Sequence, residues 1–275
     1  HSVSASNNAG FSTFSDSVMS FQWDGAILLP IASAVIIGSL GFPVLQDALK
    51  CGRNPRNWTL HTNITIVGTG LLLAAGFLVI LAAESGNAQT LGPMGWSERA
   101  LNAFFHSAMP RTAGFNSLDV GAFRDETVLF HYALMFIGGG SAGTAGGIKI
   151  TTVAVLFVIL IYQVRGRGEP ELQGHTLSYR LASQAVTVIM LALSVIFLAA
   201  FYLSVRTPHS LGVILFECIS AFATVGLSQG ITGQLPGDVE LVLEALMFLG
   251  RVGTITATTW LAMGAAGRGT PARSD

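Results

Sequence analysis

The sequence predicts an all-α integral membrane protein with repeated helix–pore loop–helix units around a central pore. Two observations predict this class. Charged residues make up 11% of the chain and hydrophobic residues 51%, whereas about 25% of a typical soluble domain is charged. A short motif centred on glycine recurs at Gly10, Gly114 and Gly226, which are 104 and 112 residues apart. That period suits a membrane unit of two spanning helices and a loop.

Long apolar runs predict the spanning helices. A helix needs about 20 apolar residues to cross a hydrocarbon core of about 30 Å. Long runs cover about 26–45, 64–83, 127–164 with an interruption, 182–203 and 239–263. We therefore expect several membrane crossings connected by short polar loops.

Each glycine motif follows a helical stretch that is too short to cross the membrane. These stretches cover about 97–109 and 210–222, and the chain opens inside a third. Irregular backbone at membrane depth is tolerated only where it lines water or is buried in protein. A single copy would favour an ordinary turn at a helix end, but three copies in equivalent places predict re-entrant pore loops, whose carbonyls can replace the hydration shell of a cation.

A glycine-rich segment interrupts the third apolar run. The stretch Gly138–Gly147 contains six glycines in ten residues, and each costs about 1 kcal/mol relative to alanine inside a helix. The segment is therefore expected to unwind, and an unwound segment below a filter is a natural gate. Two other interpretations stay open. The spacing of Gly139, Gly143 and Gly147 suits close helix packing, and Gly139-x-Ser141-x-Gly143, with His131 nearby, matches the pattern of a serine hydrolase.

Five further charged or ionisable positions carry expectations. Arg251 lies mid-way along the last apolar run, where a charge costs about 2.5–3.5 kcal/mol and faces a cavity or a partner. It is either in a salt bridge or carbonyl clamp, or at the pore beneath the filter. Lys149 is expected to extend toward the inner surface, and Glu217 to be a helix-start charge near the outer mouth. His1 and His106 are expected to make structural hydrogen bonds.

The distribution of Lys and Arg predicts the orientation. Eight lie in loops opposite the glycine motifs and four on the motif side, so the positive-inside rule places the motifs outside. The net charge of −1 provides no basic face for nucleic acid. Cys51 and Cys218 form neither a disulfide framework nor a metal motif.

Four segments, in order, resemble the Trk/Ktr/HKT superfamily of potassium transporters, and most of all the membrane subunit of the bacterial Ktr system. These segments are Asn7–Ser12, Pro110–Asn116, Gly139–Lys149 and Ala223–Ser228. The resemblance covers nearly the whole chain and implies potassium uptake across the cytoplasmic membrane by a multi-pass protein that is not an enzyme. It implies a selectivity filter that binds potassium at Asn8, Ala9, Gly10, Thr112, Ala113, Gly114, Thr224, Val225 and Gly226.

The same resemblance implies a gate beneath the filter. The family has an intramembrane loop here, which corresponds to Gly138–Lys149, and a positive residue in its last helix, which corresponds to Arg251. The segment lacks the proline and the Ser-Thr pair that are commonest in the family. The residues expected to form the gate are Gly138, Gly139, Gly140, Ser141, Gly143, Gly146, Gly147, Lys149 and Arg251.

The resemblance also implies the domain organisation and the partners. Residues 1–47 correspond to the end of a second repeat, 58–164 to a third with an inner helix interrupted at 138–149, and 176–268 to a fourth. Implied partners are membrane lipid, a second copy in a homodimer and a cytosolic ring of nucleotide-binding RCK-type regulatory subunits, without nucleic acid. The transported ion is K⁺, with Na⁺ as a possible coupling ion and no organic cofactor.

The resemblance implies an incomplete pore, because the first of the family's four repeats is missing from this chain. The preference for K⁺ over Na⁺ depends on that first repeat. Three loops do not close a four-sided pore, so the chain alone is expected not to conduct. An intramembrane serine hydrolase that uses Ser141, and a purely structural membrane subunit, are the alternative functions.

Overall fold

The computed structural model describes residues 1–52, 57–166, 170–172, 175–176 and 179–253. The predicted all-α class is confirmed, and the only strands in these ranges are two-residue segments, β1 (Glu171–Leu172) and β2 (His175–Thr176), which pair antiparallel. The α-helices are α1 (Ser2–Ser6), α2 (Gly25–Leu40), α3 (Phe42–Cys51), α4 (Leu60–Glu84), α5 (Trp96–Ala108), α6 (Asp125–Phe136), α7 (Ile150–Val164), α8 (Tyr179–Arg206), α9 (Leu211–Phe222) and α10 (Gly237–Phe248). Short 3₁₀ turns are η1 (Met19–Phe21), η3 (Val120–Ala122) and η4 (Thr232–Gln234), and a π-helix, η5 (Leu249–Gly253), follows α10.

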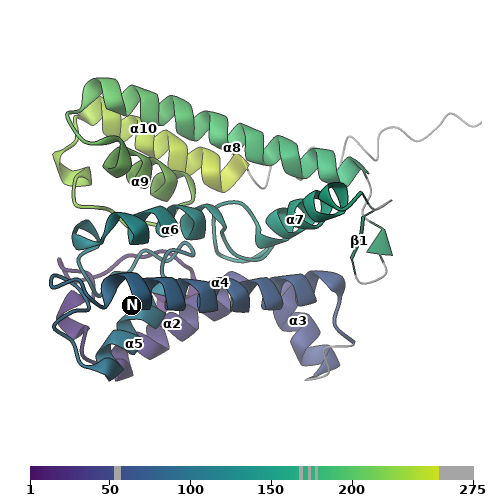
Figure 1. The fold of residues 1–275 in the computed structure, drawn as a ribbon, viewed down its shortest axis with the longest axis horizontal. Helices are drawn as coiled ribbons and strands as arrows, with labels where there is room; N and C mark the ends of the chain where they lie inside the picture. Colours follow the sequence, from purple (N-terminus) through teal and green to yellow (C-terminus); the bar gives the residue numbers. More distant parts are fainter. Residues whose placement is uncertain (53–56, 167–169, 173–174, 177–178, 254–275) are drawn as a thin grey trace, which may run out of the picture.

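The helices form two groups with a central layer between them. Figure 1 shows α8, α9 and α10 on one side, α2 to α5 on the other, and α6 and α7 between them. Three buried apolar clusters hold these groups together. One joins α1, α2 and α5, the second joins α4, α6 and α9, and the third joins α8, α9 and α10. Each cluster therefore includes one of the short helices that precede the glycine motifs.

Two helices in the described part of the chain are long and apolar enough to cross a membrane. They are α4 and the Leu181–Arg206 part of α8, and the bent pair of α2 and α3 adds a third by length and composition. The shorter α5 and α9 have 13 and 12 residues. At about 1.5 Å per residue, they span roughly two thirds of a hydrocarbon core of about 30 Å.

The apolar run over 26–45 does not form the single helix that its length predicts. It is divided at Gly41 into α2 and α3, which are bent by 92°. Gly41 has a φ of 93°, and a Cβ added there would lie 2.5 Å from the carbonyl oxygen of Ser141. Only glycine fits this turn without strain, and Pro43 in the first turn of α3 suits a helix start.

The glycine-rich segment separates α6 from α7 and is held by backbone hydrogen bonds. Gly138 N–H donates to Ile148 O at 2.8 Å, and Ile148 N–H to Phe136 O at 3.2 Å, so the two ends of the segment pair as a parallel bridge. Gly140 N–H donates to Ser39 O at 2.8 Å. Ser39 is in the last turn of α2, where carbonyls lack intrahelical donors, so the segment also caps α2.

Some sequence-based expectations fall outside the described residues. The last apolar run, predicted over 239–263, is described only as α10 and η5, and the repeat predicted over 176–268 is described only as far as Gly253. The basic residues that support the predicted orientation include five that lie outside the described ranges: Arg53, Arg56, Arg167, Arg268 and Arg273.

Candidate functional site

Each short helix ends just before a glycine motif, and the chain then folds back onto the helix. Ala9 N–H donates to Ser4 O, and Val225 N–H to Ser220 O, both at 2.8 Å. Ala113 N–H donates in a similar way to Met109 O at 3.1 Å. The C-terminal ends of α5 and α9 carry partial negative charge, which favours a cation close by.

The three motifs share an unusual backbone conformation. In each, the first residue and the glycine two positions later are both left-handed. The φ angles are 51° and 74° at Asn8 and Gly10, 70° and 71° at Thr112 and Gly114, and 53° and 88° at Thr224 and Gly226. A left-handed residue other than glycine costs about 1–2 kcal/mol, and such strain concentrates at functional sites. The same costly pattern in three loops indicates one shared purpose.

The three loops pack against one another through an equivalent contact. A Cβ added at Gly10 would lie 2.5 Å from the carbonyl oxygen of Ala113, and one added at Gly114 would overlap with the carbonyl oxygen of Val225. Ala113 and Val225 each precede the motif glycine of their own loop. A Cβ at Gly226 would lie 3.6 Å from Gly114 Cα. A contact repeated in this way is expected of loops arranged around a common axis.

Side chains of the short helices hold the outgoing part of each loop. His1 Nε2 lies 2.9 Å from Ser12 Oγ, and Glu217 Oε1 accepts from Ser228 Oγ at 2.7 Å. The two pairs are equivalent, because each serine is two residues after its motif glycine. In the middle copy, Ser117 Oγ donates to an α5 side chain, that of Asn102, at 2.6 Å.

Glu217 corrects one expectation, and the histidines confirm another. Glu217 lies in the second half of α9, so the helix-start role is wrong. Its carboxylate also accepts from Gln229 N–H and Thr232 Oγ1, both at 2.9 Å. The charge pattern of the sequence does not reveal that the loop after α9 returns to donate these hydrogen bonds. His1 bonds Ser12, and His106 Nε2 accepts from Leu118 N–H at 3.2 Å, so both histidines make structural hydrogen bonds.

The glycine-rich segment contacts the equivalent first residue of all three loops. Thr144 Oγ1 donates to Asn8 Oδ1 at 2.7 Å, and Gly146 N–H donates to Thr112 Oγ1 at 3.2 Å. A Cβ added at Gly146 would overlap with Thr224 Oγ1. Asn8, Thr112 and Thr224 form one end of the three loops, and the segment covers that end.

Two cationic side chains bind successive carbonyls of the segment. Arg251 Nη1 donates to Thr144 O at 2.5 Å, and Lys149 Nζ donates to Ala145 O at 2.7 Å. Arg251 therefore has the carbonyl contact that was one of its two expected roles, and the same contact places it beside the glycine-rich segment. Lys149 turns back onto the segment, so the expectation that it extends toward the inner surface is wrong. The partner is the backbone carbonyl of Ala145, four residues earlier. The position of Lys149 in an apolar stretch of sequence does not reveal this contact.

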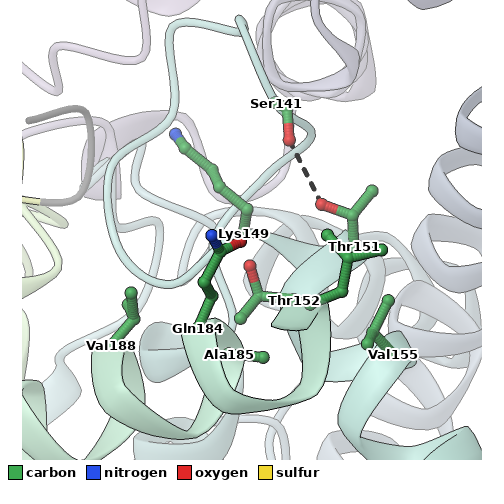
Figure 2. Close-up of a pocket in the computed structure, with 9 residues that line it drawn as sticks. Ser141, Lys149, Thr151, Thr152, Val155, Gln184, Ala185 and Val188 are labelled. Carbon is green, nitrogen blue, oxygen red and sulfur yellow. Dashed lines mark hydrogen bonds between the residues drawn. The ribbon is translucent and has the colours of Figure 1, made fainter. Parts of the chain in front are cut away.

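Ser141 lies at a cavity of about 270 Å³ beside the segment, between α7 and α8 (Figure 2). Its Oγ is 3.1 Å from Thr151 Oγ1, and the two hydroxyls point toward one another. His131 Nδ1 instead contacts Thr127 O at 2.8 Å. Ser141 thus lacks the histidine contact that the hydrolase interpretation requires. The described residues contain no group of three or more His, Cys, Asp or Glu side chains placed to hold a metal ion.

Sequence analysis missed two residues at the site. Arg111 is 1% exposed and its Nη2 donates to Thr69 Oγ1 at 3.0 Å, while Nε and Nη1 have no hydrogen-bond partner in the described part of the chain. Thr144 is the residue that links the segment to Asn8. The sequence contains a signal for Arg111, since a charge inside a re-entrant motif is costly, but its partner is 42 residues away.

An all-α fold with helices too short to cross a membrane that end in matching glycine loops defines the class of pore-loop membrane proteins. The chain belongs to the TrkH family of cation transport proteins, which matches residues 1–265.

Several curated relatives are similar over most of the chain. Ktr system potassium uptake protein B of Bacillus subtilis is 39% identical over 256 residues, which cover 93% of this chain and 57% of the relative. The protein of the same name from Vibrio alginolyticus is 37% identical and covers 95% and 58%. Potassium/sodium uptake protein NtpJ of Enterococcus hirae is also 37% identical and covers 93% and 57%. The chain therefore spans less than two thirds of the length of these relatives.

A solved structure has the same fold. The potassium transporter TrkH from Vibrio parahaemolyticus superposes with a TM-score of 0.74 at 21% identity, over 94% of this chain and 56% of that chain. At this identity the likeness concerns the fold.

Proposed function

We propose that this chain is part of a potassium uptake protein of the cytoplasmic membrane, and that its three glycine motifs are three loops of a selectivity filter. The observation that carries the proposal is the left-handed pattern that the three loops share, together with the equivalent contacts of Gly10 and Gly114 with the next loop. The filter residues are Asn8, Ala9, Gly10, Thr112, Ala113, Gly114, Thr224, Val225 and Gly226.

The proposed chemistry is replacement of the hydration shell. A cation enters a ring of backbone carbonyls that substitute for water, and the C-terminal ends of α5 and α9 add favourable potential. Glycine is needed in the third position of each motif because a left-handed residue aims the neighbouring carbonyls without the strain of a Cβ. The rest of a longer protein would supply the remaining loop, since the matched relatives extend well beyond this chain.

The gate in this proposal is the segment Gly138–Lys149 together with Arg251. The segment covers the end of the loops formed by Asn8, Thr112 and Thr224, which we call the inner end of the filter. Arg251 binds the Thr144 carbonyl of the segment at 2.5 Å. Arg251 then acts in two ways: it fixes the segment in place, and its charge raises the barrier for a cation that leaves the filter. Opening requires that this contact be released.

Ion preference, coupling and partners belong to the same proposal. K⁺ is the transported ion because two of the relatives are named for potassium uptake, and Na⁺ is the second candidate because a third relative is named for both ions. Resemblance to the Ktr system supports a homodimer in the membrane that is regulated by a cytosolic ring of nucleotide-binding RCK-type subunits. No observation favours the serine hydrolase.

The test is growth and uptake in a bacterial strain that lacks its own potassium uptake systems. The full-length parent protein should restore growth at low potassium and take up Rb⁺, a tracer for K⁺, in preference to Na⁺. A parent protein that is inserted in the membrane but moves neither cation would contradict the proposal. Adding and withholding Na⁺ in the same assay tests the coupling.

A further inference from the structure

The segment Thr144–Gly146 places hydrogen-bond donors on side-chain oxygens of the filter. The hydroxyl of Thr144 donates to Asn8 Oδ1, and the N–H of Gly146 donates to Thr112 Oγ1. Gly146 also lies so close to Thr224 Oγ1 that no Cβ would fit. Asn8, Thr112 and Thr224 hold the same position in the three loops, so one short segment contacts the equivalent residue of each loop.

We propose that the segment Thr144–Gly146 caps the filter, so that closure of the gate and binding of an alkali cation at the inner end of the filter exclude one another. This inference rests on the proposed function and deepens it. Amide and hydroxyl oxygens are the hard ligands that alkali and alkaline-earth cations prefer. Each of these oxygens has two lone pairs, and the hydrogen bond from the cap uses one of them. It also places the donor proton, which carries partial positive charge, next to the oxygen where a cation would bind. The cap therefore occupies the ligands that a cation would use.

Thr144 is the centre of the cap because three of its groups are bound by different parts of the chain. Its hydroxyl donates to Asn8 Oδ1 at 2.7 Å, its carbonyl accepts from Arg251 at 2.5 Å, and its N–H donates to Gly38 O at 3.3 Å. Asn8 extends the network, because its Nδ2 donates to Arg111 O in the next loop at 3.3 Å. Movement of the segment thus breaks contacts with two filter loops and with the last helix together.

The direction of coupling follows from linkage. A ligand that binds only one of two conformations shifts the population toward that conformation. A cation that needs the oxygens of Asn8 and Thr112 binds when the cap is displaced, so K⁺ should open the gate. A cation too large to enter the filter, such as N-methyl-D-glucamine, should leave the cap closed.

Hydrogen exchange of the full-length parent protein tests this directly, because it follows the cap without requiring transport. Backbone amides of residues 140–147 should exchange faster in K⁺ than in N-methyl-D-glucamine at equal ionic strength. Amides of α8 should exchange equally in both and serve as an internal control. Equal exchange of residues 140–147 in the two cations would overturn the inference.

The variant Thr144→Val removes the hydroxyl donor and keeps the carbonyl that Arg251 binds. Loss of one hydrogen bond should raise the open population roughly two- to tenfold, so residues 140–147 should exchange fast without K⁺ and Rb⁺ uptake should rise. Thr187→Val is the matched control, because Thr187 Oγ1 donates to Ser183 O within α8 and contacts neither the segment nor the filter. The inference fails if Thr144→Val behaves as Thr187→Val does.

A second variant covers the case in which Thr144→Val does not fold. Gly146→Ala should push the cap off Thr224 Oγ1 and give the same fast exchange. Amide exchange of residues 140–147 as slow as in wild type would contradict the cap.

The proposed function and the cap can be refuted separately. A parent protein without K⁺ uptake refutes the proposed function, whereas uptake with exchange that does not respond to K⁺ refutes only the cap.

Discussion

Gly114 lies against Val225 so closely that a Cβ on Gly114 would overlap with the Val225 carbonyl oxygen. Gly10 lies similarly close to the carbonyl oxygen of Ala113, which holds the same position in the second loop as Val225 holds in the third. Both glycines are left-handed. Two independent constraints, conformation and space, therefore require glycine at these positions, and they support a filter in which neighbouring loops are in direct backbone contact.

The first prediction concerns Arg251. Arg251→Gln removes the charge and weakens the contact with Thr144 O. Hydrogen bonds to charged groups contribute about 1.5–3 kcal/mol, so the gate should open more often and Rb⁺ uptake by the full-length parent should rise by about tenfold or more. Arg206→Gln is the control, because Arg206 pairs with Asp238 on an exposed surface away from the gate. Uptake by Arg251→Gln at the wild-type rate would contradict the gating role.

A second prediction concerns Glu217, which accepts three hydrogen bonds from the loop after the third motif. Glu217→Gln keeps the shape but loses the charge and one acceptor oxygen, so it should lower the free energy of unfolding by about 1–3 kcal/mol. Thermal unfolding in detergent measures this change. Glu244→Gln, on the exposed side of α10, should leave the melting temperature unchanged. If both variants melt together with wild type, Glu217 does not hold the loop.

A third prediction concerns the buried guanidinium of Arg111. Its hydrogen bond to Thr69 Oγ1 fixes the second motif to α4. Thr69→Val keeps the volume and removes the acceptor, so stability should fall by about 1.5–3 kcal/mol. Thr187→Val makes the same change at an exposed site on α8. Melting temperatures of the two variants should differ, and equal values would show that Arg111 has another anchor.

The membrane class and the short helices were predictable from local sequence. The count of charged residues indicated a membrane protein, and α5 and α9 begin and end within one residue of the stretches predicted over 97–109 and 210–222. The glycine motifs were also recognisable locally, because glycine tolerates the backbone angles of such a loop.

Features that depend on distant partners were not predictable. The bend at Gly41 forms where the carbonyl of Ser141 approaches, 100 residues later in the chain. Thr144 bonds Asn8 across 136 residues. Lys149 and Glu217 were misjudged for the same reason: the sequence identifies a charge and its apolar surroundings but not the carbonyl or the returning loop that binds it.

The most direct test of the central claim is competitive uptake of Rb⁺ and Na⁺ by the full-length parent protein, with Gly114→Ala beside wild type. A left-handed alanine costs about 1–2 kcal/mol and its Cβ would overlap with the carbonyl of Val225. Gly70→Ala is the matched control, because nothing lies within 4 Å of a Cβ at Gly70. We predict that wild type and Gly70→Ala prefer Rb⁺, whereas Gly114→Ala loses that preference by about tenfold. Unchanged preference in a folded Gly114→Ala protein would contradict the assignment of these loops as a filter.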